Sequence, residues 1–126
     1  HDKLPEAGLA ALRRPILSGM AGAKRYIVGI TGASGALYAQ AVVRAVLASG
    51  AQCHLCITPF GHRLLSDELG LAATTPDGLA ALAGLDGRFT IESLRERGLI
   101  YHATNDVGAD IGSGSFRHDG MVIVPC

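Results

Sequence analysis

Residues 26–36 read Tyr-Ile-Val-Gly-Ile-Thr-Gly-Ala-Ser-Gly-Ala, and this stretch decides the fold class. Its first part, residues 26–31, is a run of apolar and β-branched residues without polar alternation. Such a run is typical of a strand that is buried on both faces of a parallel sheet. Two glycines then interrupt the run. From Ala36 to Ser49 a helix is expected, because apolar residues recur there at three- and four-residue spacing, namely Leu37, Ala41, Val42, Ala45 and Val46.

The same alternation of strand and helix continues along the chain. A second strand is predicted over residues 52–58, and Pro59 ends it because proline cannot continue a central strand. The apolar residues of 60–70 have a helical period, and residues 120–124 form a further apolar run. Leu99–His102 is a candidate short strand. Strands that alternate with helices indicate an α/β fold with a parallel sheet and right-handed connections.

Two regions have a weaker pattern. In residues 71–98, Asp77 is expected to cap a short helix over 78–83, and glycines punctuate residues 84–98. Short helical segments are expected at residues 5–13 and 110–115.

Composition excludes several classes of protein. The 126 residues fit one domain, and 48% apolar residues are enough to form a core. Lysine plus arginine and aspartate plus glutamate number 11 each, so no basic excess points to nucleic acid. No apolar run has the roughly 18–20 residues that a membrane span requires.

The cysteines and histidines do not indicate a metal site. The chain has only three cysteines, and an odd, small number argues against a disulfide framework. Such a set of cysteines suits a reducing cytoplasm. Cys53 and Cys56 form a C-x-x-C pattern, which is typical of redox pairs and zinc sites. No second ligand pair follows, so we interpret them as residues of a buried strand. The five histidines are scattered, and none has a ligand partner at metal spacing.

The loop after the first strand is the candidate binding site. Gly32-Ala33-Ser34-Gly35 leads from a strand into a helix, whose first N–H groups attract anions. The dinucleotide fingerprint is absent, because Ile30 stands where its first glycine is required. The second strand ends on Thr58 and not on an acidic residue, which suits a phosphate or a flavin better than a ribose. The alternative is that the loop is only a tight turn.

Two further side chains have both a catalytic and a structural interpretation. Ser34 is either a nucleophile or proton donor, or simply the cap of the following helix. Glu68 is either a catalytic carboxylate or part of a solvated helix face.

Several motifs match one protein family in order. Residues 24–38, the strand His54–Thr58 followed by Glu68, and the segments 112–116 and 120–126 resemble the UbiX/Pad type of flavin prenyltransferase. The resemblance spans about residues 24–126 and is loosest over 72–100. Each motif alone is modest, and the ordered set is specific.

The resemblance implies a flavodoxin-like, Rossmann-like three-layer fold and binding of FMN, without a metal. By position, Gly32, Ala33, Ser34 and Thr58 would contact FMN, and Ser34 with Glu68 would relay protons. Ser113 and Ser115 would shape the pocket of the donor, dimethylallyl phosphate. The prenylated FMN would serve a UbiD-type decarboxylase, in ubiquinone biosynthesis or in aromatic-acid breakdown. Family members form homo-oligomers, typically dodecamers.

Other interpretations stay open at this point. A related flavoprotein decarboxylates cysteine derivatives, but it usually has a catalytic histidine in the first helix region, and residues 36–49 contain none. A non-catalytic FMN-binding module and a degraded gene fragment are further alternatives.

The ends of the chain also lead to expectations. Residues 1–23 are expected to be an extension, with Met20 as a plausible start, and residues 24–126 an FMN-binding domain that is incomplete at its C-terminus. The family's phosphate-binding Lys, Arg and Tyr lie beyond Pro125 and Cys126, so these 126 residues alone are predicted to be inactive.

Overall fold

The computed structural model describes residues 23–32, 35–103 and 117–124. They form four strands and four helices: β1 (Arg25–Ile30), α2 (Ala36–Ala48), β2 (Gln52–Ile57), α3 (Pro59–Leu69), α4 (Pro76–Ala83), α5 (Ile91–Glu96), β3 (Leu99–His102) and β4 (Gly120–Val124). Among these residues, no helix is long and apolar enough to cross a bilayer.

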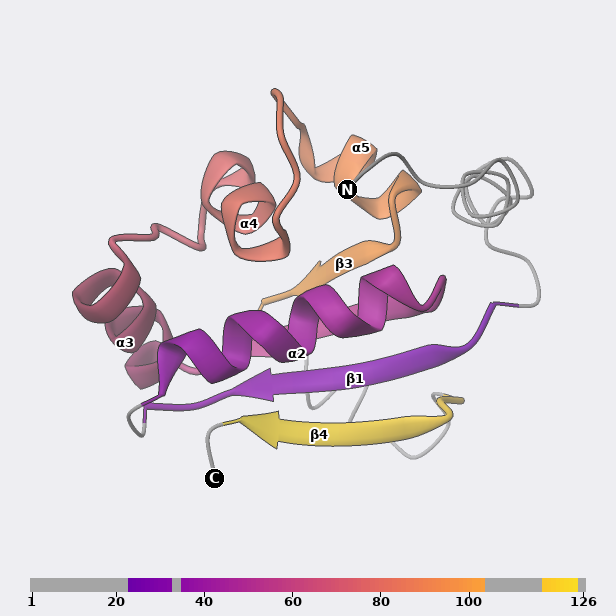
Figure 1. Cartoon of the computed structure of the whole chain (residues 1–126), viewed down its shortest axis with the longest axis horizontal. Coiled ribbons are helices and arrows are strands. Elements are labelled where there is room, and N and C mark those ends of the chain that lie inside the picture. Colours follow the sequence, from indigo (N-terminus) through magenta and orange to yellow (C-terminus); the bar gives the residue numbers. More distant parts are fainter. Residues whose placement is uncertain (1–22, 33–34, 104–116, 125–126) are drawn as a thin grey trace, which may run out of the picture.

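The strands form a single parallel sheet in the order β3-β2-β1-β4. β1 is a central strand and pairs with β2 on one side and with β4 on the other. Figure 1 shows the arrows of β1, β3 and β4 pointing in one direction, with α2 lying alongside β1. The predicted α/β class with a parallel sheet is confirmed, including the short strand Leu99–His102. The predicted helical segments at 5–13 and 110–115 lie outside the described residues.

The core lies between the sheet and the helices. One face of the sheet contributes alternate residues of each strand, and the helices contact one another over it, α2 touching α3 and α4, and α4 touching α5. The fully buried side chains of this core include Val28, Ile30, Leu55, Ile57, Val43, Leu65, Leu79 and Leu99. The sheet and this helical cover are two of the three predicted layers. The described residues do not test the third.

The helix α2 begins and ends where the sequence predicts, but it buries a different stripe. Leu37 is 68% exposed, whereas the small residues Ala36 and Ala39 are fully buried together with Val43. Small side chains let the first turns of a helix lie close to a sheet, so they face inward and the larger Leu37 faces solvent. At the other end, the Arg44 guanidinium donates to the last carbonyls of α4, at Leu82 (3.2 Å) and Ala81 (3.0 Å).

The region 71–98 contains two capped helices, and one correction concerns its first cap. Thr75, and not Asp77, is the N-cap of α4, because its hydroxyl accepts from the Gly78 N–H at 3.0 Å and Pro76 occupies the first helical position. The helix α5 was missed. Thr90 and Ser93 form a reciprocal capping box with serine in place of the usual Glu or Gln.

Two histidines that are far apart in the sequence meet on the sheet face opposite the helices. The Nδ1 atom of His54 lies 2.9 Å from Nε2 of His102, and its Nε2 lies 2.8 Å from Oε1 of Gln52. An amide oxygen only accepts, so His54 donates through Nε2 and accepts through Nδ1 from His102. A proton on His54 Nδ1 would reverse this hydrogen bond and require the other tautomer of His102.

Burial confirms that His54 is held neutral. The side chain is only 7% exposed. Burial, followed by the nearby His102, Arg25 and Arg95, lowers the pKa of His54 to about 4. Because the unfolded chain takes up this proton at a higher pH, the stability that His54 contributes is fully present above about pH 6.5 and is lost as the pH falls towards 4.

This titration predicts a steep loss of stability in acid. Between pH 6.5 and pH 4 the free energy of unfolding should fall by up to about 3 kcal/mol on account of His54. In His54→Gln, which cannot titrate, the slope should be shallower than in the native chain. Urea unfolding at several pH values measures both slopes. Equal slopes for the native chain and His54→Gln would contradict the assignment.

Candidate functional site

The carboxyl ends of the parallel strands form the candidate site. The chain runs from β1 through β2 to β3 in one direction and places β4 on the other side of β1, so the strand order reverses between β1 and β4. In open α/β sheets, ligands bind in the crevice at this reversal. The backbone N–H of Thr31 donates to Val124 O at 3.0 Å, and that of Thr58 donates to Ile30 O at 3.0 Å. These bonds hold the ends of β1, β2 and β4 together.

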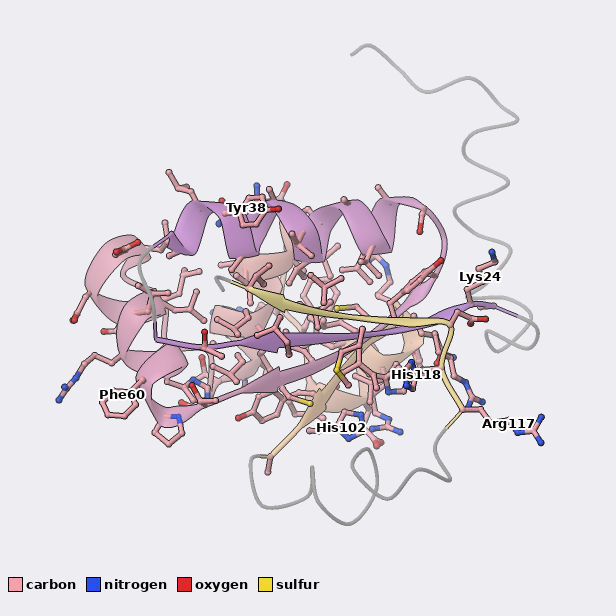
Figure 2. The ribbon with its side chains drawn as sticks, turned by 90° about the horizontal axis from the view of Figure 1, so that it is seen from below. Lys24, Tyr38, Phe60, His102, Arg117 and His118 are labelled. Atoms are coloured by element: carbon pink, nitrogen blue, oxygen red, sulfur yellow. The ribbon has the colours of Figure 1, made fainter. Side chains whose placement is uncertain are left out.

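The loop after β1 packs closely on the first turn of α3. A Cβ atom on Gly32 would lie 2.3 Å from Cβ of Phe60, and a Cβ on Gly61 would lie 2.4 Å from Ile30 O. Both distances are far shorter than van der Waals contact, so each position requires glycine. Figure 2 shows Phe60 at the end of the molecule where α3 begins. Gly32 thus lies at the sheet edge where the sequence places the cofactor loop.

Thr58 has a structural role at the start of α3. Its hydroxyl accepts from the Gly61 N–H at 3.0 Å and donates to Ile30 O at 3.3 Å. Thr58 is therefore the N-cap that the sequence around Pro59 requires, and it lies at the carboxyl edge of β2 as predicted. One lone pair of the hydroxyl oxygen is left for a ligand.

Glu68 reaches from α3 to the N-terminus of α2. Its Oε1 atom accepts from the Ala36 N–H at 2.9 Å and from the Gly35 N–H at 3.3 Å. Gly35 is the N-cap residue, with a φ of 113°, and has no side chain that could satisfy these donors. The Glu68 carboxylate supplies the missing acceptor and a negative charge at the positive end of the helix dipole. The side chain is exposed, but it is bound and does not merely face solvent.

The other predicted site residues lie outside the described residues. These are Ala33, Ser34, Ser113 and Ser115. Of the predicted set, the structure therefore describes Gly32, Thr58 and Glu68. It brings all three to the carboxyl edge of the sheet.

A histidine in the first turn of α3 was not singled out from the sequence. Nε2 of His62 lies 3.1 Å from the hydroxyl oxygen of Tyr101 on β3, with the rings edge to face. Burial lowers the pKa of His62, and burial followed by the nearby Cys56 raises the pKa of Tyr101. Because the two residues are 39 positions apart and on different elements, sequence spacing contained no signal for this contact.

The cysteines fit the interpretation as residues of a buried strand. Both lie on β2 as free thiols, and burial, followed by Cys56, raises the pKa of Cys53 to about 12. Burial also raises the pKa of Cys56. A thiol with a raised pKa is a poor nucleophile and a poor metal ligand. Within the described ranges, no three His, Cys, Asp or Glu side chains are arranged to hold a metal ion.

A second hollow lies at the opposite edge of the sheet. It has a volume of about 380 Å³ and is lined by Lys24, Tyr26 and residues 49–51. These residues precede or begin strands, so the hollow is at the amino ends and remote from the loop after β1. Its position argues against a role in the site.

Comparisons with known proteins agree with the site. No protein-family model matches the chain. The flavin prenyltransferase UbiX of Thauera aromatica is 34% identical over 102 residues, which cover 81% of this chain and 43% of the relative. UbiX of Streptomyces coelicolor is 37% identical over 105 residues, covering 79% and 49%. The mitochondrial flavin prenyltransferase PAD1 of Saccharomyces cerevisiae is 32% identical over 103 residues, covering 82% and 35%.

Two solved structures have the same fold. AnUbiX (PadA1), in complex with FMN and dimethylallyl pyrophosphate, superposes with a TM-score of 0.61 at 30% identity, covering 82% of this chain and 46% of that one. A dodecameric FMN-dependent UbiX-like decarboxylase from Escherichia coli O157:H7 has a TM-score of 0.58 at 32% identity, covering 81% and 46%. The chain spans less than half the length of these proteins. Over that span, it is related in sequence and in fold to the UbiX/Pad flavin prenyltransferases, as its motifs indicate.

Proposed function

We propose that the protein containing this chain is a flavin prenyltransferase, which transfers a dimethylallyl group from dimethylallyl phosphate to reduced FMN. One observation carries the proposal: the Glu68 carboxylate accepts from the Gly35 N–H, and Gly35 directly follows Ser34 in the chain. The Glu68 carboxylate is therefore held beside the loop that contains Ser34, although Glu68 lies on α3, 33 residues after Gly35 in the chain.

The chemistry requires groups of this kind. The C–O bond of the allylic ester would break and the phosphate would leave with the electron pair, while a bond forms at flavin N5 and the N5 proton is removed. For the second bond, the remaining C=C double bond of the prenyl group would take up a proton, and C6 would add to the resulting tertiary cation and lose its own proton. A carboxylate that acts through a hydroxyl can accept such protons when both groups are within hydrogen-bond reach. We assign this relay to Ser34 and Glu68, and the binding of FMN to Gly32, Ala33, Ser34 and Thr58.

The described residues restrict where the phosphate of FMN can lie. The N–H groups of Gly35 and Ala36 already donate to the Glu68 carboxylate. A phosphate at the same donors would displace that carboxylate or lie next to a like charge, which is unfavourable. We infer that the start of α2 faces the flavin ring and that the phosphate is bound elsewhere. Thr58 is a candidate for the phosphate, because its hydroxyl hydrogen, which donates to Ile30 O over 3.3 Å, can turn to a phosphate oxygen instead.

Related proteins support the same activity. The relatives described above are named flavin prenyltransferases, and AnUbiX was solved with FMN and dimethylallyl pyrophosphate. A cysteine decarboxylase of the same fold has less support, because α2 contains no histidine. By the same resemblance, we propose that prenylated FMN passes to a UbiD-type decarboxylase.

The exposed apolar side chains support a homo-oligomer, and we propose that it is a dodecamer. Met121 on β4 is 52% exposed and Ile123 44% exposed, and Leu37 and Tyr38 project from α2. Apolar side chains that are exposed on two elements are candidates for contact with other subunits. The neighbouring E. coli protein is described as dodecameric. Free thiols fit the cytoplasm as the proposed location.

The activity has a direct test. The whole protein, incubated with reduced FMN and dimethylallyl phosphate, should yield a flavin that is heavier by one prenyl group in a mass spectrum. Ser34→Ala and Glu68→Gln should each lower the rate by about 10²-fold or more, because general acid–base catalysis contributes at that scale. Ser66→Ala, at an exposed position on α3, should keep the original rate. Unmodified FMN from a folded protein that binds it would contradict the proposal.

The capping role of Glu68 can be separated from its proposed chemistry. Glu68→Ala leaves two N–H groups of α2 without an acceptor and should lower the free energy of unfolding by about 1 kcal/mol. Glu68→Gln keeps an amide oxygen that can accept, so it should lose less stability while it loses the relay. Urea unfolding measures both variants, with Asp67→Ala as the exposed control on the same helix. Equal stability of Glu68→Ala and Asp67→Ala would argue against the cap.

A further inference from the structure

The first turn of α3, residues 59–62, is fixed to its surroundings by several contacts. Thr58 caps it, and Gly61 lies against Ile30 O. Phe60 lies against Gly32 in the loop after β1. These contacts all bind the turn to β1 and to its loop. The hydrogen bond from His62 to Tyr101 is different, because it connects the turn to β3, two strands away from β1.

The hydrogen-bond roles in this connection follow from the surroundings of the imidazole. The Nδ1 atom of His62 is buried and has no hydrogen-bond partner among the described residues. A buried N–H without an acceptor costs more than a nitrogen lone pair that is left unpaired, because the polar hydrogen loses its water. The neutral tautomer with its hydrogen on Nε2 is therefore favoured, and Nε2 donates to the Tyr101 hydroxyl at 3.1 Å.

Tyr101 is a firm anchor for this bond. Its ring packs against the hydrophobic core on the helix side of the sheet. The next residue, His102, is bound to His54 on the opposite side. The end of β3 is thus held from both faces of the sheet. The hydrogen bond from His62 fixes the first turn of α3 relative to that end.

We propose that His62 and Tyr101 are positioning residues for the flavin site, and that their hydrogen bond holds the first turn of α3 against the Gly32 loop only while His62 is neutral. The proposal rests on the proposed function. It deepens that function by adding two residues that need not touch the flavin and a dependence on pH.

The dependence on pH follows from the geometry. A second proton on His62 would have to sit on Nδ1, inside the protein and without an acceptor among the described residues. The lowered pKa of His62, which burial causes, agrees with this cost. Among the titratable groups of the described residues, Tyr101 from β3 contacts His62, and Cys56 from β2 is near Tyr101. Burial raises the pKa of Tyr101 and of Cys56, so both groups are neutral below pH 7. The imidazolium would still donate through Nε2, but its Nδ1–H would be buried without an acceptor among the described residues, so the charged side chain would turn out of this position. The bond is therefore present at neutral pH and is lost as the pH falls.

The test uses the whole protein and its affinity for FMN, measured by flavin fluorescence at pH 7.5 and pH 5.5. Tyr101→Phe keeps the ring and removes only the hydroxyl, so it should weaken FMN binding at pH 7.5 about fivefold, the equivalent of one hydrogen bond. It should raise KM for FMN more than it lowers kcat. His62→Gln keeps a donor near the position of Nε2 and cannot titrate, so it should bind FMN almost normally and lose the acid-induced weakening. His118→Gln should retain the weakening of the native protein.

The outcomes separate the two proposals. Unchanged FMN affinity in Tyr101→Phe, or an unchanged pH profile in His62→Gln, would overturn the positioning role. If the native protein binds no FMN at all, the proposed function fails, and amide hydrogen exchange then tests the hydrogen bond itself. The amides of residues 60–62 must exchange faster in Tyr101→Phe than in the native protein. Equal exchange rates of these amides in the two proteins would show that the His62–Tyr101 hydrogen bond does not hold the turn.

Discussion

The loop after β1 and the first turn of α3 touch backbone to backbone, and the candidate site depends on this contact. A single added methyl group at Gly32 or Gly61 would overlap with Phe60 or with the Ile30 carbonyl. Protein interiors transmit such overlaps because they are densely packed. The contact places Thr58 beside the end of β1 and sets the direction in which α3 leaves the sheet. Glu68 lies at the far end of that helix, so its reach to α2 depends on the same direction.

The N-terminus of α2 illustrates how one residue meets two requirements. Its cap, Gly35, has a left-handed backbone conformation, which suits glycine, but glycine has no side chain to accept from the first N–H groups. A serine or aspartate at this position would be strained at a φ of 113°, and its side chain would accept from the N–H of residue 37 or 38, so it would not replace Glu68 at Gly35 and Ala36. Glycine in the loop and glutamate on α3 are therefore complementary. The carboxylate is held by backbone groups that cannot rotate away.

Sequence patterns predicted the sheet well and the polar contacts less well. Parallel strands have an apolar signature, so β1, β2 and β4 were evident in runs such as residues 26–31. The same pattern predicts that β4 is buried, which is wrong for Met121, Val122 and Ile123, since these side chains are exposed among the described residues. The six-residue helix α5 was missed, since it is too short for a periodic pattern and its capping box uses Ser93. The prediction that Leu37 lies on the apolar, buried side of α2 was wrong. Periodicity shows that a helix has an apolar side, but it does not show how closely small residues let the helix approach the sheet.

The contacts of the site were the least predictable part, because they depend on strand register and on helix direction. His54 and His102 become neighbours only through the pairing of β2 with β3, in which Cys56 lies opposite His102. Glu68 could be assigned to either of two roles from the sequence. In the structure Glu68 caps the start of α2, which is neither of these roles, and both hydrogen bonds from Gly35 and Ala36 end on Oε1. A carboxylate has a second oxygen, and an oxygen that is oriented by a fixed neighbour loses little entropy when it accepts a proton from a hydroxyl. The cap that stabilises α2 can therefore also prepare Glu68 for the proton transfer proposed with Ser34.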